Sequence, residues 1–231
     1  AMRIEGGNLL SNGRGLCIAT EEIVNVNSDR GLTEDAVAEV LRSCFGAKQT
    51  VLLEPLAGEM TGHVDMFATF TSADTVVVGS IPRAADPVNS AILDRNAAKL
   101  ATVRTERGRL KVVRIPMPPH GDGIWRTYTN VIYANGLLLV PIYPGIDAKG
   151  QQQAMQTFAQ LLPGWRIVGL DARTLCELGG ALHCISMNLG PAEPPPGSRL
   201  DRARRRAPPE IPAVPALQPL DEFREMARIP D

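Results

Sequence analysis

The sequence predicts an α/β fold in which a strand–strand–helix–strand unit is repeated within one domain. Three observations support this class. The same order of strand and helix patterns recurs three times, with a period of roughly 55 to 65 residues, and such self-similarity is typical of repeat-built domains. A tight-turn Asn-Gly dipeptide separates the first two strands of the first and third units. Apolar residues make up 44% of the chain and charged residues 21%, the composition of an ordinary globular protein.

The first unit shows the pattern most fully. We expect a hairpin of strands Leu9–Leu10 and Leu16–Ala19, because the Asn12-Gly13 turn supplies the positive φ values that a tight connection needs. Thr33 is a predicted N-cap, and Gly46 is the predicted end of the helix that follows it. Between them, apolar side chains (Val37, Val40, Leu41 and Cys44) recur with the helical spacing i, i+3, i+4, i+7.

The remaining elements repeat this order. Helices are predicted from Asp86-Pro87 and from about Lys149 to Leu162. A strand over Ala181–Met187 is predicted to close the series. The other predicted strands are Thr50–Leu53, Asp65–Thr71, Thr75–Gly79, Leu110–Ile115, Asn130–Ala134, Leu137–Tyr143 and Trp165–Leu170.

Composition changes sharply near residue 190, which divides the 231 residues into a domain (1–190) and a tail (191–231). The tail is rich in proline and arginine, and proline favours an extended chain over a packed one. A short helix is predicted over Leu220–Ala227. The arginines around Arg204–Arg206 are interpreted either as a solvated segment or as a patch for an anionic partner.

Charge and cysteine content exclude several classes of protein. The net charge is −1 and the isoelectric point is near 6.4, so no basic field predicts nucleic-acid binding. No apolar run approaches the roughly 20 residues that span a bilayer, and no signal-peptide pattern marks export, so we expect a cytoplasmic protein that does not contact membranes. Four cysteines without a C-x-x-C pair predict neither a disulfide framework nor a metal site.

Four short clusters lie at equivalent places in the units, at the starts of predicted strands. They are Glu5–Asn8, Thr61–Asp65, Thr127–Asn130 and Gly179–Cys184. Equivalent strand ends converge near the axis of a pseudo-symmetric repeat. We therefore expect the four clusters to share one central cleft.

His63 and Asp65 are two residues apart on a predicted strand, so both side chains are expected on the same face. They interrupt an apolar segment, and burying them is costly unless they are bonded to each other, to the backbone or to a ligand. One interpretation is a hydrogen-bonded pair in the core. The other is an acid–base histidine beside an aspartate that receives a cation.

Cys184 is either an inert core cysteine or a nucleophile. The inert interpretation suits Cys17, Cys44 and Cys176. Cys184 differs because Gly179-Gly180 allows close backbone approach just before it. A thiol nucleophile needs a base, and His63 is preferred over His183, because neighbouring residues on a strand point to opposite faces.

Together the four clusters resemble motifs of the agmatine deiminase and bacterial-type peptidylarginine deiminase family. The motifs are Glu-Gly-Gly-Asn, Gly-His-Val-Asp-x-Phe, Tyr-Thr-Asn and Gly-Gly-Ala-Leu-His-Cys-Ile-Ser, in this order, and the resemblance spans residue 4 to about residue 188. That family belongs to the pentein (guanidine-modifying) superfamily. The resemblance implies a five-module propeller of strand–strand–helix–strand units with pseudo-fivefold symmetry.

The resemblance also implies hydrolysis of a guanidino group, of agmatine or of peptidyl-arginine, to the ureido product and ammonia. It assigns the nucleophile to Cys184 and proton transfer to His63. Asp65 and Glu5 would bind and support the substrate, and Asn130 matches an asparagine near it. His183 is only part of the motif. No cofactor or metal is implied, and the partner is a small guanidine or an arginine-containing peptide.

The family also has a second guanidinium-binding aspartate, in a first-module segment that would precede Glu5. We therefore expect the sequence to begin part-way through the propeller, without most of its first module. Exposed sheet edges would then favour a homo-oligomer. Two other functions stay open at this point: an inactive pentein that acts as a binding module, and an amidinotransferase that uses the same cysteine chemistry.

Overall fold

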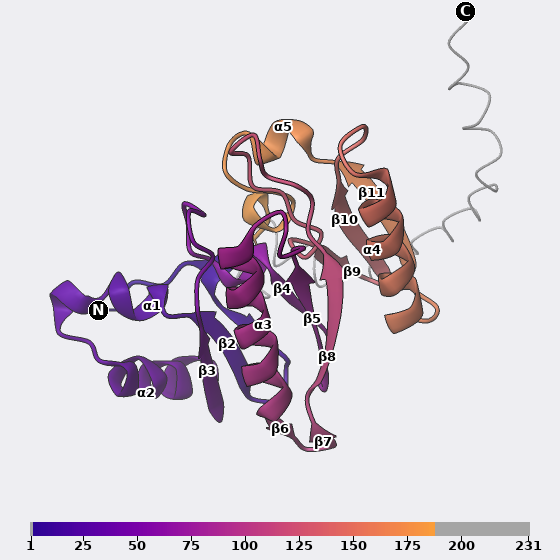
Figure 1. Cartoon of the computed structure of the whole chain (residues 1–231). Helices are drawn as coiled ribbons and strands as arrows, with labels where there is room; N and C mark the ends of the chain where they lie inside the picture. The colour runs from indigo at the N-terminus through magenta and orange to yellow at the C-terminus, as the bar shows by residue number, and fades with distance from the viewer. Residues whose placement is uncertain (1, 188–231) are drawn as a thin grey trace, which may run out of the picture. The chain divides into compact units, whose positions relative to one another are not determined.

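The computed structural model describes residues 2–187, which form one compact unit (Figure 1). The predicted tail and its helix at Leu220–Ala227 lie outside the described residues. Within residues 2–187, no helix is both long enough and apolar enough to cross a membrane.

Three three-stranded sheets repeat one topology, so the predicted strand–strand–helix–strand unit is confirmed. In each sheet the middle strand pairs antiparallel with the first strand and parallel with the last. The sheets are β1 (Leu10–Ser11), β2 (Leu16–Thr20) and β3 (Gln49–Leu53); β4 (Ala68–Ser72), β5 (Thr75–Ser80) and β8 (Lys111–Pro116); and β9 (Ile132–Ala134), β10 (Leu137–Ile142) and β11 (Arg166–Asp171).

One long helix connects the parallel strands of each unit, as predicted. The helices are α2 (Glu34–Phe45), α3 (Pro87–Thr102) and α4 (Ala148–Leu161). The Thr33 hydroxyl caps α2, and Gly46 ends it in the left-handed region at φ 68°. Asp86 and Asp147 cap the other two helices by accepting backbone N–H groups of the first turn.

Several short elements were not predicted from the sequence. A two-stranded ribbon extends from the end of α3, and four single-turn 3₁₀ helices occur in the connections. The additional elements are α1 (Glu22–Asn25), α5 (Arg173–Cys176), β6 (Arg104–Thr105), β7 (Gly108–Arg109), η1 (Gly6–Asn8), η2 (Ser28–Arg30), η3 (Val64–Met66) and η4 (His183–Ile185).

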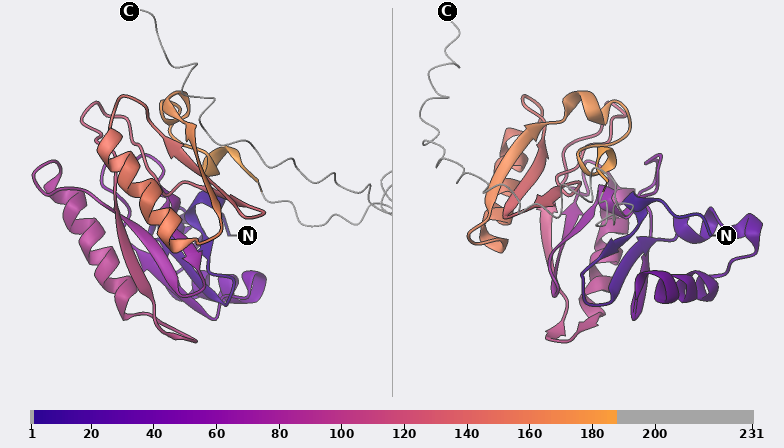
Figure 2. Two further views of the ribbon diagram at one scale, coloured as in Figure 1. Left: turned by 90° about the vertical axis from the view of Figure 1, so that its right-hand side faces the viewer. Right: turned by 180° about the vertical axis from the view of Figure 1, so that it is seen from behind.

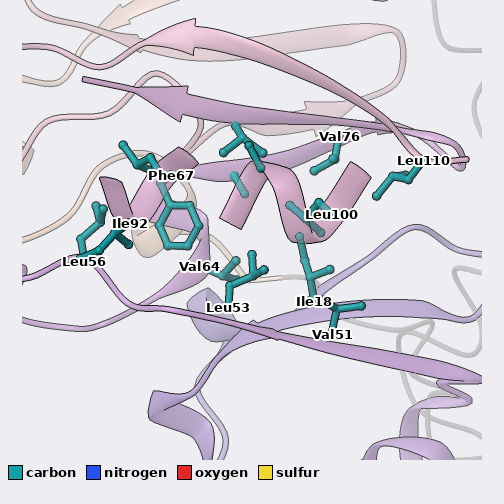
Figure 3. Close-up of a cluster of buried hydrophobic side chains, with 14 of the residues drawn as sticks. Ile18, Val51, Leu53, Leu56, Val64, Phe67, Val76, Ile92, Leu100 and Leu110 are labelled. Carbon is teal, nitrogen blue, oxygen red and sulfur yellow. The ribbon is translucent and has the colours of Figure 1, made fainter. Parts of the chain in front are cut away.

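The central strands carry two cores at once, because successive side chains of a strand point to opposite faces. In β5, Val76 and Val78 belong to the core between the first two units, whereas Val77 belongs to the core between the second and third. Figure 3 shows the first of these cores, in which Ile18 of β2 and Leu100 of α3 approach each other. Burying apolar surface between units therefore joins them into one domain.

Each later helix also contacts the unit before it. α3 packs on β5 and β8 of its own sheet and on β3 of the first sheet. α4 packs on β11 of its own sheet and on β8 of the second, so that β8 lies between the two helices (Figure 2). This packing gives the three units one consistent side-by-side arrangement.

Three sequence predictions differ from the structure. The strand predicted over Ala181–Met187 is wrong: residues 183–185 form η4 instead. The strand predicted over Asp65–Thr71 begins only at Ala68, because η3 occupies the residues before it. Cys44 is exposed rather than packed in the core, whereas Cys17 and Cys176 are buried as expected.

Candidate functional site

Direct side-chain contacts connect all four predicted clusters. Glu5 contacts His63, Thr129 contacts the backbone of Asp65, and His183 contacts the carboxylate of Asp65. Asn130 contacts Cys184, which joins the third cluster to the fourth. The structure therefore brings Glu5, His63, Asp65, Asn130 and Cys184 together, although the turns that carry them are far apart in the chain.

Asn8 anchors the first cluster to the second. Its side chain is buried, and its Oδ1 accepts hydrogen bonds from the backbone N–H groups of Thr20 at 2.8 Å and of Val64 at 3.3 Å. The bond from Val64 holds η1 against η3. As a result, Glu5 Oε2 lies 2.5 Å from His63 Nε2, with the carboxylate largely in solvent and the imidazole mostly covered.

Gly7 makes room for the second cluster. A Cβ atom at this position would lie 2.5 Å from His63 Nδ1 and 2.9 Å from Asp65 Oδ2, both far inside normal contact distances. The backbone of η1 therefore packs directly against both side chains. His63 and Asp65 do converge on one point, as predicted, although they do so from a 3₁₀ turn and its N-cap rather than from a strand.

Asp65 is a buried carboxylate whose side chain is only 2% exposed. Thr129 Oγ1 donates to its backbone carbonyl at 3.1 Å, which fixes the turn. The two carboxylate oxygens differ: Oδ2 lies 2.7 Å from His183 Nδ1 and 4.0 Å from Cys184 Sγ. Oδ1 is buried and has no hydrogen-bond partner among the described residues, so an acceptor is left open inside the site.

Asn130 positions the turn that carries Cys184. It is fully buried, and its Oδ1 accepts the backbone N–H of His183 at 2.8 Å and of Cys184 at 3.3 Å. Its Nδ2 donates to Cys184 Sγ at 3.3 Å. Gly180 is needed on the other side, because a Cβ there would lie 3.0 Å from the sulfur.

The surroundings of Cys184 favour the neutral thiol in the empty site. Desolvation by burial raises the pKa of the thiol, and the negative charge of Asp65 raises it further. The hydrogen bonds with Ala181 and Asn130 lower this pKa, but they do not offset the increase. A thiolate at this position therefore needs a base or a nearby cation.

His183 lies on the same side as Asp65, which corrects the sequence prediction. A strand would have turned its side chain away from the neighbouring Cys184, but η4 places its Nδ1 2.7 Å from Asp65 Oδ2. The hydrogen bond with Asp65 raises the pKa of His183, and partial burial opposes this increase.

A pocket of about 310 Å³ lies beside the Glu5–His63 pair. Its lining includes Glu5, Asn8, Glu22 and His63. Asp65 and Cys184 are not among the described residues that line this pocket.

A model of a known protein family matches the whole of this compact unit. Residues 1–190 match the family model described as Porphyromonas-type peptidyl-arginine deiminase. The chain belongs to this family. The family predicted from the four motifs is thereby confirmed.

Curated and solved members of the same family group are similar over most of this chain. A Legionella pneumophila protein named "Putative agmatine deiminase" is 29% identical over 193 residues, covering 79% of this chain and 54% of the relative. Solved structures include one titled as the "Putative Arginine Deiminase" of Porphyromonas gingivalis (27% identity, TM-score 0.72, 81% of this chain and 57% of that one). Agmatine deiminase of C. jejuni has 25% identity and a TM-score of 0.69, covering 80% and 54%.

The chain thus spans about half the length of the curated deiminases that it matches. Identities near 25–29% support the family and its fold, and the TM-scores show that the three units adopt the arrangement of solved deiminases.

Three residues that shape the site are not predicted from the sequence. Gly7 and Asn8 stand in the Glu5–Asn8 cluster, yet only Glu5 was singled out there. The available signal for Asn8 was its position directly before a predicted apolar strand, where a polar side chain is expected to accept backbone hydrogen bonds. His183 was set aside because a strand was assumed, and no periodicity distinguishes a 3₁₀ turn of three residues from a strand end.

Proposed function

We propose that this chain carries the reacting groups of a guanidine deiminase, on three modules of a pentein propeller. The reaction is hydrolysis of the guanidino group of agmatine or of a peptidyl-arginine to the ureido product and ammonia. One observation carries the proposal: a cysteine sulfur 4.0 Å from a buried carboxylate whose other oxygen has no partner among the described residues. A cation-binding acid beside a nucleophile is the arrangement that this chemistry needs.

The open oxygen of Asp65 suits a guanidinium ligand. A guanidinium is planar and cationic, and its N–H groups form charge-assisted hydrogen bonds with carboxylates. Binding one N–H at Oδ1 would satisfy a buried acceptor that otherwise costs free energy. The sulfur of Cys184 lies 4.0 Å from the other oxygen, Oδ2, so the nucleophile and the open acceptor border the same carboxylate.

In the first half of the reaction, the Cys184 thiolate attacks the guanidinium carbon and forms a C–S bond. The tetrahedral adduct then loses one amino group: its C–N bond breaks, and the departing nitrogen takes a proton from His63 and leaves as ammonia. An S-linked thiouronium cation remains on the enzyme. A histidine suits this step because its ordinary pKa lies near neutrality.

In the second half, neutral His63 takes a proton from water while the oxygen attacks the thiouronium carbon. The C–S bond then breaks, the hydroxyl proton of the adduct passes to solvent, and the ureido product leaves, with the Cys184 thiolate and protonated His63 restored. Glu5, 2.5 Å from His63 Nε2, orients the imidazole. Asn130 Nδ2 contributes a hydrogen bond to the sulfur in both halves.

A bound substrate cation also helps to form the nucleophile. The pKa of Cys184 is raised in the empty site, first by burial and then by the charge of Asp65. A guanidinium bound to Asp65 neutralises that charge and adds a positive charge near the sulfur. Both effects lower the thiol pKa when the substrate is present.

The test is turnover of three guanidino compounds: agmatine, free arginine and an arginine-containing peptide. Ammonia and ureido product are measured with the full chain, with Cys184→Ala, and with the control variant Cys44→Ala, whose thiol is exposed and distant from the site. We expect product with at least one substrate, none with Cys184→Ala, and an unchanged rate with Cys44→Ala.

Labelling with a haloacetamidine provides a second readout, because this reagent combines a guanidine-like head with a leaving group that a thiolate displaces. Selective modification of Cys184 is expected, with protection by the substrate. No product from any of the three compounds and no selective labelling would contradict the proposal. Equal turnover by Cys184→Ala would exclude the sulfur as the nucleophile.

A further inference from the structure

His183 and Asp65 form a second histidine–carboxylate pair, separate from the His63–Glu5 pair. His183 Nδ1 lies 2.7 Å from Asp65 Oδ2, and the two residues are 118 positions apart in the sequence. The Asp65 side chain is 2% exposed and that of His183 is 31% exposed, so the pair reaches from the interior to the surface of the site. The reaction sequence proposed above uses Asp65 but gives His183 no task.

The backbone holds His183 in place. Its N–H donates to Asn130 Oδ1 at 2.8 Å, and its carbonyl accepts from the Ser186 hydroxyl at 2.8 Å and the Ser186 N–H at 3.0 Å. Hydrogen bonds therefore fix both the N–H and the carbonyl of His183, independently of its imidazole. This fixed backbone aims Nδ1 at Asp65, as a pre-organised donor does.

The hydrogen bond between His183 and Asp65 makes the two oxygens of the carboxylate different. Oδ2 is taken by His183, whereas buried Oδ1 has no hydrogen-bond partner among the described residues. A carboxylate held at one oxygen cannot rotate freely, so the other oxygen keeps one direction. That oxygen is the one left for a ligand N–H.

A positive charge on His183 would conflict with a cation bound to Asp65. Protonated His183 and a guanidinium would both need the single negative charge of Asp65, and the two cations would repel each other across it. Neutral His183 keeps the Nδ1–H donor and leaves the charge to the ligand. The other titratable groups around the pair are Glu5, His63, Cys184 and Glu59, whose negative charge also acts on Cys184, and Glu5 already pairs with His63.

We propose that His183 is a positioning residue for Asp65, and that it releases a proton to solvent when a guanidinium cation binds there. The donor Nδ1–H fixes Oδ2 in both states, and only the proton on Nε2 leaves. This inference rests on the proposed function for its ligand class. The pairing of His183 with Asp65 can be tested without any ligand.

The first experiment follows the titration of the three imidazoles by NMR in the full chain and in Asp65→Asn. We expect His183 to titrate at higher pH in the unchanged protein than in Asp65→Asn, and to carry its neutral-form proton on Nδ1. His120, paired with Asp86, serves as the internal reference. An unchanged His183 titration in Asp65→Asn, or a neutral tautomer protonated on Nε2, would overturn the positioning role.

The second experiment measures agmatine binding calorimetrically with Cys184→Ser, in buffers that differ in ionisation enthalpy. At a pH where free His183 is largely protonated, binding is expected to release close to one proton, and affinity is expected to rise with pH. His183→Asn retains a side-chain N–H donor near the position of Nδ1, so it should bind within about threefold of the parent but release no proton. His183→Leu removes the donor and should bind about tenfold or more weakly, the effect of losing a hydrogen bond to a charged group.

The outcomes separate the inference from the function. Agmatine binding without proton release, or equal binding by His183→Leu and His183→Asn, would overturn the role of His183 while leaving the deiminase proposal standing. No binding of agmatine, of free arginine or of an arginine-containing peptide would refute the proposed ligand class and the proton release together. The NMR titration would still decide whether His183 positions Asp65.

Discussion

The side-chain amide of Asn130 holds both the backbone and the sulfur of Cys184. Its Nδ2 lies 3.3 Å from Sγ, and its Oδ1 accepts the Cys184 N–H at 3.3 Å. One buried residue thus sets the position of the thiol and of the turn that carries it. A relationship of this kind predicts that the loss of Asn130 affects reactivity as well as stability.

Asn130→Ala is expected to destabilise the fold by about 1–3 kcal/mol, because it removes the side-chain acceptor of the partly buried N–H groups of His183 and Cys184. Turnover is expected to fall about tenfold or more, since misplacing a reacting group by 1 Å can have effects of this size. Urea unfolding and product formation measure the two effects.

Asn12→Ala is the matched control. Asn12 Oδ1 also accepts two backbone N–H groups, those of Arg14 and Leu16, but in the hairpin turn of the first unit. It should lose stability without losing turnover per folded molecule. Equal loss of turnover in the two variants would show that Asn130 acts only through stability.

Gly7→Ala tests the close approach of η1 to His63 and Asp65. The added Cβ would fall 2.5 Å from His63 Nδ1, so the imidazole must move, and turnover is expected to drop about tenfold or more. Gly6→Ala is the control, because a Cβ on the adjacent residue meets nothing within 4 Å. Similar rates for the two variants would be inconsistent with the packing described above.

The pH dependence of Cys184 alkylation tests the electrostatics of the site. Only the thiolate reacts, and burial and Asp65 raise the pKa of this thiol, so the rate should keep rising at pH values above the ordinary range of cysteine. Asp65→Asn removes a negative charge beside the sulfur and should move the midpoint to lower pH. The rates are measured with iodoacetamide in a Cys44→Ala background, which removes the other exposed thiol among the described residues. A midpoint that does not respond to Asp65→Asn would contradict the contact.

Asp86→Ala tests the start of α3. Asp86 Oδ1 accepts the N–H groups of Val88 at 3.0 Å and of Asn89 at 2.9 Å, so losing this cap should cost about 1–2 kcal/mol of unfolding free energy at pH 7. Hydrogen bonding with Asn89 holds the pKa of Asp86 below its usual range. Its contribution is therefore present above the ordinary pKa of aspartate, and it is lost as the pH falls through the lowered value.

Urea unfolding at pH 7 and at pH 3 measures both predictions for Asp86. Asp35→Ala is the control, because this exposed first-turn residue of α2 interacts with the helix dipole without capping the helix. Its effect should be smaller than that of Asp86→Ala. Equal effects would argue against the cap.

The repeating units were predictable because local signals and tertiary packing agree. Thr33 and Gly46 bound α2 as their capping preferences indicate. Asn135 and Gly136 both adopt positive φ, at 50° and 78°, as the turn between β9 and β10 requires. The convergence of the four clusters also followed from the repeat, since equivalent positions in equivalent units meet.

The turns within the clusters were not predictable, because long-range hydrogen bonds decide them. The mostly apolar segment around His183 is consistent with a strand, but Asn130, 53 positions earlier, takes the backbone N–H of His183 that a sheet would need. Similarly, Asn8 takes the N–H of Val64, 56 positions later, and η3 replaces the predicted start of β4. No local pattern carries information about such distant acceptors.

The bonds that unite the four clusters have a consequence for folding kinetics. They join residues from 53 to 119 positions apart, so closing them requires loops that are entropically costly until the three hydrophobic units have docked. Helices and hairpins can form earlier from neighbouring residues. Competence for chemistry should therefore appear late during refolding, after most of the circular-dichroism signal has returned.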